Sequence, residues 1–422
     1  MDKLSPQFAT QRAVEAVWRI EAARLIGGLT KMTRDVGLAE ELASDALVVA
    51  LQQWPETGIP ANPGAWLMQT AKRRAIDQFR RKKMVAEKLP ELSYEAELKE
   101  QEAPDYDERL DDEVKDNLLS LIFTACHPIL GPEARSALTL RLVGGLTTAE
   151  IARAYLVPEP TIQQRIVRAK KTLADAGVPF EVPRGAERQA RIGSVLEVLY
   201  LIFNEGYSAT AGDDWMRTEL CDEALRVGRI LARLAPEEPE VHGLVALMEI
   251  QASRAGARTK ADGTPILLLE QDRARWNQIL IRRGLAALNA VEQLDGANGP
   301  YALQAAIAAC HARARKAADT DWQRIAALYD ELAIVTPSPI VELNRAVAHS
   351  MAFGPEAGLR LLEPLTETKI LQGYHLLPSV RGDFLQKLGR HDEARAEFRR
   401  AADMTQNVRE KQLLLKRAAG QA

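Results

Sequence analysis

Polar and basic side chains of the types that contact nucleic acid gather in one short segment of the sequence. They follow Pro158-Glu159-Pro160, which predicts the start of a helix because proline is tolerated in a first helical turn. Apolar residues spaced i, i+4, i+7 and i+11 give this helix one buried face: Ile162, Ile166, Ala169 and Leu173. The other positions carry Gln163, Gln164, Arg165, Arg168 and Lys171. Arginine suits guanine edges, glutamine suits adenine edges, and later basic residues suit phosphates, so the segment predicts DNA binding.

A shorter helix is expected directly before this one. Thr147 and Glu150 have the spacing of a capping box, which predicts a helix from Thr148 to Tyr155. Ile151, Ala152 and Tyr155 would face inward, and Leu156-Val157 would form the turn. A short helix, a tight turn and a second helix with a polar face make up the helix-turn-helix layout. The alternative is an ordinary hairpin of two helices with a solvated basic face.

A second basic surface is predicted between Asn62 and Lys83. The part from Lys72 to Lys83 has seven basic residues and one acidic residue, Asp77, a net charge of +6. An apolar stripe runs along the whole segment from Asn62 to Lys83 and consists of Trp66 or Leu67, Thr70, Ala71, Ile76 and Phe79. This stripe leaves Lys72, Arg73, Arg80, Arg81 and Lys83 pointing outward. Such a helix could follow a phosphate backbone and offer rings to unstacked bases, although a charge run can also be a plain solvated face.

The charge pattern divides the chain, although the total charge is only −3. The block from Glu87 to Asp116 has thirteen acidic and four basic residues, a net charge of −9, and contains two prolines. This composition predicts a solvated acidic linker at residues 85–113, between helical modules at 8–84 and 114–176. Helical periodicity dominates the chain and the turn pairs typical of β-hairpins are missing, so we expect an all-α fold.

In this order, the segments resemble an alternative RNA polymerase sigma factor of the extracytoplasmic-function type, in the sigma-70 family. The resemblance rests on Glu40-Glu41-Leu42, Asp45-Ala46, Ala50-Leu51 and Trp54-Pro55, then on Trp66-Leu67, Ala71 to Asp77 and Arg80-Arg81, and finally on the acidic linker and Leu146 to Leu173. It covers residues 8–176. Two positions depart from the family pattern: Arg73 stands where Asn is common, and Ser44-Asp45 stands where Gln-Glu is usual.

The resemblance implies two partners, core RNA polymerase and promoter DNA. Residues 8–84 would be the region 2 domain, which binds core polymerase and the minus-ten element, and residues 114–176 would be the region 4 helix-turn-helix domain. The residues implied in polymerase binding are Leu42, Asp45, Leu47, Leu51 and Trp54, with Asp45 facing the polymerase and the three leucines in the core.

The resemblance also assigns the DNA contacts. The loop from Pro55 to Ala65 would hold a flipped base of the minus-ten element, and Lys72, Arg73, Arg80 and Arg81 would grip its backbone. The minus-thirty-five element would be contacted by Gln163, Gln164, Arg165, Arg168 and Lys171.

Residues 301–420 show a helical repeat. Six residues fit the 34-residue tetratricopeptide (TPR) spacing: Gly382, Leu385, Gly389, Ala394, Phe398 and Ala401. Gly354 precedes Gly389 by 35 residues, and Ile325, Tyr329 and Leu332 precede the last three of these positions by 69. Pro337, Pro364 and Pro378 are expected in turns between helices. The pattern predicts TPR-like repeats with a possible protein partner; a generic helical bundle is the alternative.

Residues 182–300 form the rest of a predicted helical extension. The segments Leu199 to Tyr207, His242 to Gly256 and Ala261 to Asn277 resemble the extension of a sigma subfamily with fused repeats. In that subfamily the extension is thought to regulate or support activity. Pro265 to Leu269 is strand-like, and it could be a docking loop or a buried loop packed on helices.

Other functional classes are disfavoured by the sequence. Six residues could in principle form a metal or acid/base site, but such groups in helical domains usually make ion pairs or caps: Glu205, His242, Glu249, Asp262, Glu270 and Asp272. The adjacent pairs Cys126-His127 and Cys310-His311 point to different helix faces, so neither suits shared metal ligation. We therefore expect no enzyme, no metal and no cofactor.

The expected location is the cytoplasm, because the sequence shows neither a signal peptide nor an apolar run long enough to span a membrane. Two other functions stay open. The chain could be a helix-turn-helix regulator that binds duplex DNA without being a polymerase subunit, with the repeats sensing a partner. It could also be a repeat scaffold whose DNA-binding segments are vestigial.

Overall fold

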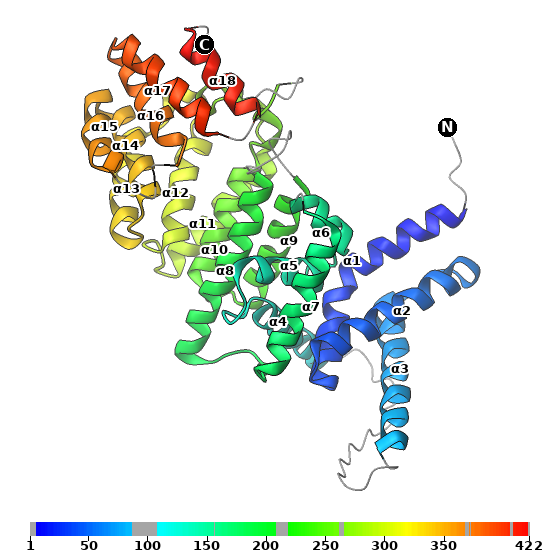
Figure 1. Ribbon diagram of the computed structural model, residues 1–422. Helices are drawn as coiled ribbons and strands as arrows, with labels where there is room; N and C mark the ends of the chain where they lie inside the picture. The colour runs from blue at the N-terminus through cyan, green and yellow to red at the C-terminus, as the bar shows by residue number, and fades with distance from the viewer. Residues whose placement is uncertain are drawn as a thin grey trace. The chain divides into compact units, whose positions relative to one another are not determined.

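The structure, a computed structural model, describes residues 6–86, 108–155, 157–207, 218–260, 266–367, 371, 373–405 and 408–420. These ranges fold into α-helices and short 3-10 turns, and no strand occurs among them, which confirms the all-α prediction. The chain divides into two compact units, Met1–Val198 and Leu199–Ala422 (Figure 1).

The helices of the first unit cover both predicted DNA-binding segments. They are α1 (Pro6–Thr33), α2 (Val36–Thr57), α3 (Pro63–Ala86), α4 (Glu108–Ala125), α5 (Pro132–Leu142), α6 (Thr148–Tyr155), α7 (Glu159–Asp175) and the first part of α8 (Gly185–Tyr207). Helix α1 packs against α2, α3 and α4, with Leu25, Ile26 and Leu29 buried. A Cβ on Gly27 would lie 2.9 Å from the Asn117 carbonyl oxygen, so the backbones of α1 and α4 approach closely at that glycine.

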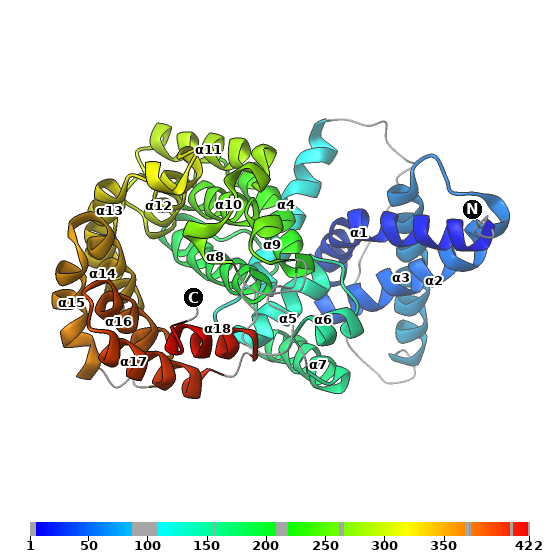
Figure 2. The same cartoon turned by 90° about the horizontal axis from the view of Figure 1, so that it is seen from above.

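The second unit continues from the end of α8 through a further series of helices. They are α9 (Thr218–Leu234), α10 (Pro239–Ala252), α11 (Gln278–Gln293), α12 (Pro300–Arg313), α13 (Trp322–Val335), α14 (Pro339–Phe353), α15 (Pro355–Leu362), α16 (Leu376–Lys387), α17 (His391–Met404) and α18 (Val408–Ala418). From α12 to α17 the helices form consecutive antiparallel hairpins, each packed on the next, and α18 covers the last one (Figure 2).

The glycines of the predicted repeat lie where close packing or a turn requires them. Gly354 and Gly389 have φ of +97° and +75°, and each stands just before the second helix of a hairpin. A Cβ on Gly382 would lie 2.8 Å from the ring of Phe398, which is buried on the facing helix α17. The spacing of these residues therefore describes a helical hairpin, as the repeat pattern predicts.

Several finer expectations are wrong. Pro378 lies in the first turn of α16 rather than between helices. Proline is tolerated there because an N–H group in the first turn has no acceptor within the helix. The strand-like segment contains a 3-10 turn at Leu268–Glu270, with Pro265 outside the described residues. Helix α2 continues through Pro55 to Thr57, so the loop before α3 is shorter than the predicted Pro55 to Ala65.

The acidic linker is also shorter than predicted at its C-terminal end. Helix α4 begins at Glu108, inside the predicted linker at 85–113. Residues 87–107, which hold most of the acidic side chains, lie outside the described residues.

Candidate nucleic-acid interface

Helices α6 and α7 form the predicted helix-turn-helix. The main-chain N–H of Glu150 donates to Thr147 Oγ1 at 3.1 Å, and the N–H of Thr147 donates to Glu150 Oε2 at 2.8 Å, which confirms the capping box. Burial would raise the pKa of Glu150, but the hydrogen bonds that its carboxylate accepts from the Thr147 N–H and hydroxyl, together with the charge of Arg19, outweigh burial and lower that pKa. The cap therefore holds a charged carboxylate at the start of α6, where the helix dipole favours it.

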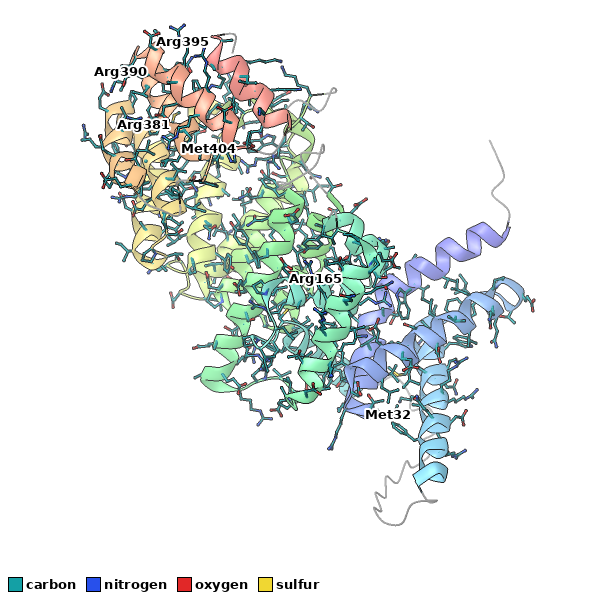
Figure 3. All side chains as sticks on the ribbon, in the orientation of Figure 1. Met32, Arg165, Arg381, Arg390, Arg395 and Met404 are labelled. Carbon is teal, nitrogen blue, oxygen red and sulfur yellow. The ribbon has the colours of Figure 1, made fainter. Side chains whose placement is uncertain are left out.

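The two faces of α7 separate as the sequence predicts. Its buried residues are Ile162, Ile166, Ala169 and Leu173. Gln163, Gln164, Arg168 and Lys171 are exposed on the other side of the helix. Arg165 is half-buried and forms an ion pair with Glu133 of α5 at 2.6 Å (Figure 3). Four of the five predicted contacts are thus open to solvent, and Arg165 would have to leave Glu133 to reach a base.

Helix α3 presents the second basic surface. Leu67, Ala71 and Ala75 are buried, and Lys72, Arg73 and Arg80 are exposed. Ala75 was missed by the predicted stripe, whereas Ile76 and Phe79 are only half-buried. The side chains of Arg81 and Lys83 lie outside the described part of the structure. Three of the four side chains predicted to contact the DNA backbone are therefore exposed on this one helix.

The helix implied in polymerase binding, α2, differs from expectation at its apolar positions. Leu42 is buried, but Leu47 is half-buried and Leu51 is 40% exposed, so the prediction that all three leucines lie in the core is wrong. Leu51 and Val48, which is 49% exposed, give the helix an apolar outer surface. Trp54 is 2% exposed and packs edge-to-face on Trp66, with 5.3 Å between ring centroids. Trp54 therefore supports this region from within.

Asp45 is the acidic residue of α2 that the resemblance assigns to the polymerase. It already has a partner within this region, since Arg74 of α3 donates to its carboxylate at 2.6 Å. Both side chains are close to half-exposed, so the pair is a surface ion pair of small net strength. A basic partner could compete for Asp45 at low cost.

Glu40 makes a contact that no sequence pattern indicated. Arg141 of α5 donates to its Oε1 at 2.5 Å, and Lys170 of α7 donates to its Oε2. The Glu40 side chain is 9% exposed. Burial raises its pKa, but the charges of Lys170 and Arg141 outweigh burial and hold the pKa below its ordinary value. This contact ties α2 to the helix that carries the candidate DNA-reading residues.

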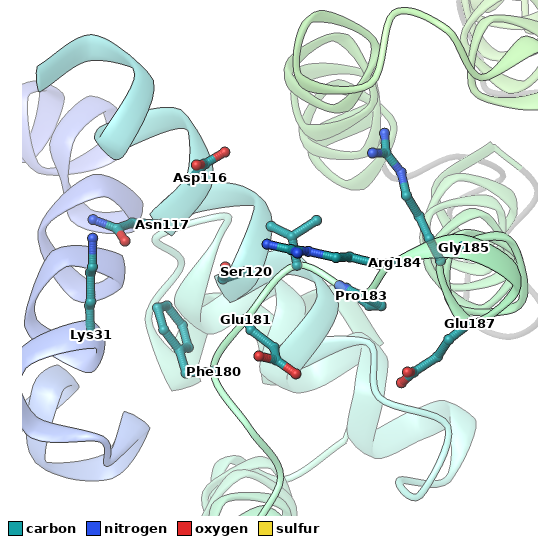
Figure 4. Close-up of a pocket in the computed structure, with 12 residues that line it drawn as sticks. Lys31, Asp116, Asn117, Ser120, Phe180, Glu181, Pro183, Arg184, Gly185 and Glu187 are labelled. Atoms are coloured by element: carbon teal, nitrogen blue, oxygen red, sulfur yellow. The ribbon is translucent and has the colours of Figure 1, made fainter. Parts of the chain in front are cut away.

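An open hollow of about 700 Å³ lies elsewhere in the first unit (Figure 4). It is bounded by Lys31 of α1, by Asp116 and Ser120 of α4, and by the segment from Phe180 to Arg188. Its lining mixes positive and negative side chains without converging on one point, so it indicates no ligand class.

The candidate catalytic residues do not come together. Glu249 is buried and pairs with Arg229 at 2.7 Å, His242 Nε2 contacts the Pro236 carbonyl, and Asp272 caps a 3-10 turn through the N–H of Ala274. Asp262 lies outside the described residues. Within the described ranges, no three His, Cys, Asp or Glu side chains are grouped as metal ligands would be.

The cysteines are buried or half-buried thiols. Burial raises the pKa of Cys126 to about 11 and that of Cys221 to about 12. These thiols are protonated at neutral pH and are weak metal ligands and nucleophiles. Among the described helices, none is both long and apolar enough to cross a membrane.

Comparison with known proteins agrees with this arrangement. Residues 19–84 match the family model described as Sigma-70 region 2, and residues 120–173 match the model described as Sigma-70, region 4. Residues 191–292 match a model described as a family of unknown function (DUF6596). Over 387 residues the chain is 44% identical to "Uncharacterized protein R00370" of Rhizobium meliloti (strain 1021), a match that covers 91% of this chain and 90% of that protein. With its two sigma regions in order and helices α8 to α18 after them, the chain belongs to the sigma-70 family, as an extracytoplasmic-function-type factor with a C-terminal extension.

Proposed function

We propose that this chain binds core RNA polymerase in the cytoplasm and directs it to specific promoters. The observation that carries the proposal is the exposed face of α7, where Gln163, Gln164, Arg168 and Lys171 stand opposite a fully buried apolar face. A helix supported on one side in this way can enter a major groove with its polar face, on which Val167 is also 64% exposed. The exposed Lys72, Arg73 and Arg80 of α3 supply a second surface for the other promoter element.

The polymerase contact is assigned to the outer surface of α2. Leu47 and Leu51 are accessible there, and Asp45 carries the acidic charge. Leu42 and Trp54 hold the helix in place from its buried side. In this proposal the two buried residues act through stability and the three accessible ones act through contact.

Run-off transcription with purified core polymerase and a promoter library tests the proposal. We expect promoter-dependent transcripts above those of core polymerase alone. Replacing both Arg168 and Lys171 with Glu should abolish them, because the reversed charges repel phosphates. The matched control is Arg283→Glu on the exposed face of α11, which should leave transcription unchanged.

Two other outcomes would overturn the proposal. Tight and specific duplex binding without polymerase, with no run-off transcript, would identify a helix-turn-helix regulator. Promoter output that is indifferent to the charge reversal on α7 would show that this helix does not read DNA.

We also propose that the extension regulates promoter output, through a ligand or through a protein partner of the TPR-like hairpins. The support is the length of the second unit, Leu199–Ala422, which is fused to the sigma regions. The test compares the full chain with a fragment that ends at Val198, the end of the first compact unit. Equal transcription from both, at equal amounts of folded protein, would refute regulation.

A further inference from the structure

Three segments that stand out in the extension converge on one polar cluster in the second unit. Tyr207 ends the first segment, Arg254 lies in the second, and Arg273 and Trp276 lie in the third. Arg254 donates to the Tyr207 phenol oxygen at 2.5 Å, and its guanidinium lies 5.8 Å from the centre of the Trp276 ring. Arg273 stacks on the same ring at 5.2 Å. Residues far apart in sequence thus assemble around one tryptophan.

The cluster concentrates positive charge inside the protein. Arg258 joins it, with its guanidinium 3.7 Å from the centre of the Tyr207 ring and a hydrogen bond to the Tyr207 carbonyl. Arg258 is 9% exposed and Arg273 is 7% exposed. Burial and the charge of Arg254 lower the pKa of both. The charge of Arg254 therefore disfavours the charged state of both Arg258 and Arg273.

Nearby carboxylates do not neutralise Arg254 or Arg273. No carboxylate among the residues that the structure describes forms an ion pair with either guanidinium. Asp319 is close enough to favour the charge of Arg273, but it is exposed and unpaired with it. Arg273 instead donates to the carbonyls of His311 and Ala314, at 2.7 and 2.9 Å, and to Thr320 Oγ1 at 2.8 Å. These neutral acceptors fix the guanidinium without cancelling its charge.

Within the described part of the structure, four nitrogen atoms of the cluster are buried without a hydrogen-bond partner: Arg254 Nε, Arg273 Nε, Trp276 Nε1 and His311 Nδ1. The last three belong to side chains that are at least nine-tenths buried. Burial, followed by the charges of Arg254 and Arg273, lowers the pKa of His311 to about 4, so its ring is neutral at pH 7. Buried donors in native proteins find an acceptor, and an unpaired buried charge is costly.

We propose that this cluster binds a small oxyanion, with Arg254, Arg273 and Trp276 as its donors. One anionic group would accept hydrogen bonds from otherwise unpaired N–H groups and neutralise part of the buried positive charge. Guanidiniums suit carboxylate and phosphate equally well, so the shared chemistry is a planar or tetrahedral oxygen anion. The extension is then a ligand-binding domain, whatever the role of the sigma regions.

Calorimetric melting of the full chain tests this site with phosphate, sulfate, acetate and succinate, each against chloride at equal ionic strength. A ligand that binds only the folded state raises the melting temperature with its concentration. We expect saturable stabilisation of one transition by at least one oxyanion. A response to phosphate and sulfate would indicate a phosphorylated ligand, and a response to acetate or succinate would indicate a carboxylate.

Two variants place the effect in the cluster. Arg254→Gln should weaken the apparent affinity by about tenfold or more, because it removes a charged donor. Trp276→Phe keeps a ring of similar shape and removes only the Nε1–H, so it should weaken binding by about fivefold. Arg283→Gln, on exposed α11, is the control and should bind like the unmodified chain.

The proposal fails if no oxyanion stabilises the chain beyond chloride. It also fails if Arg254→Gln and Trp276→Phe both respond like the unmodified chain, since the anion would then bind elsewhere. Neither result bears on transcription, so the proposed sigma function is judged separately by the run-off assay.

Discussion

Glu40 is a carboxylate of α2 whose two cationic partners lie 101 and 130 residues further along the chain. The Arg141 side chain is 21% exposed and that of Lys170 is 22% exposed, so all three groups are largely withdrawn from water. Removing one member of a buried ion pair destabilises a protein more than removing one member of a surface pair, because it leaves buried charge without a partner. We therefore expect Glu40 to contribute to the stability of the first unit through this contact.

We expect Glu40→Gln to destabilise the first unit by about 1–3 kcal/mol, because Arg141 and Lys170 lose their common anion. Calorimetric or urea unfolding of the full chain measures the change. Glu41→Gln is the matched control, since Glu41 is exposed on the same helix and should change stability by less than about 0.5 kcal/mol. Equal stability of the two variants would contradict a structural role for Glu40.

The same contact predicts a dependence on pH. The pKa of Glu40 is lower in the folded chain than its ordinary value. Its stabilising contribution is therefore complete above the unfolded-state pKa, about 4.3, and is lost as the pH falls through the folded-state value. The stability difference between the unmodified chain and Glu40→Gln should be constant from pH 7 to about pH 5.5 and shrink below pH 4. A difference that grows on acidification would show that the sign is wrong.

Individual residues differ in how far their contacts could be predicted from the sequence. The Thr147–Glu150 cap was predictable because both partners lie within one turn of α6. The partners of Glu40 were not, because nothing local to α2 specifies a contact with α5 or α7. Leu51 was misplaced for a different reason: the buried face of α2 near its end runs through Ala46, Ala50 and Trp54, and Leu51 lies beside that face rather than on it.

Among the helical elements, the hairpin of α16 and α17 is held together by close packing of a large side chain against a glycine. Gly382 lets the Phe398 ring approach α16 directly, and Arg381 donates to Glu397 at 2.5 Å beside it. Sequence predicted this hairpin because its small and large residues keep a fixed spacing within one repeat. It misplaced Pro378, since the spacing of prolines does not distinguish a first helical turn from the preceding loop.

The surroundings of two helical glycines, Gly382 in this hairpin and Gly193 in α8, predict opposite effects for the same substitution. Gly382→Ala should destabilise the second unit by about 1–3 kcal/mol, because the new methyl group would meet the Phe398 ring at 2.8 Å. Gly193→Ala in α8 should stabilise the first unit by about 0.5–1 kcal/mol, because nothing lies within 4 Å of the new Cβ and alanine favours the helix. Thermal unfolding of each variant gives both signs, and destabilisation by Gly193→Ala would refute the second.

At the scale of the whole molecule, α8 contributes residues to both compact units. In its first half, Arg191 donates to the Phe123 carbonyl at 2.8 Å and Ser194 donates to the Cys126 carbonyl at 2.6 Å. Arg135, which is 7% exposed, donates to Glu197 at 2.9 Å. The sequence places the start of the extension near residue 182, but the structure uses α8 up to Val198 to complete region 4. The reason is that α8 covers the carbonyls at the end of α4.

This arrangement predicts that two truncations differ in stability. A fragment that ends at Gly177 loses the caps of α4 and the partner of Arg135, so it should melt several degrees below a fragment that ends at Val198. Melting followed by circular dichroism at 222 nm provides the comparison. If the two fragments melted together, the first half of α8 would be dispensable for region 4.

Under the proposed promoter function, the Glu40 contact affects how the chain can reach two separated sites on DNA. Elements named minus-ten and minus-thirty-five lie about 25 base pairs apart, which is roughly 85 Å along a straight duplex. With Lys170 of α7 bonded to Glu40 of α2, the candidate reading helix stands directly beside the region that would bind the minus-ten element. If the chain engages both elements as proposed, we expect this contact to break, so the free energy that Glu40 adds to the free protein would oppose simultaneous engagement of the promoter. Glu40→Gln should then be a less stable protein that opens onto its promoter more readily.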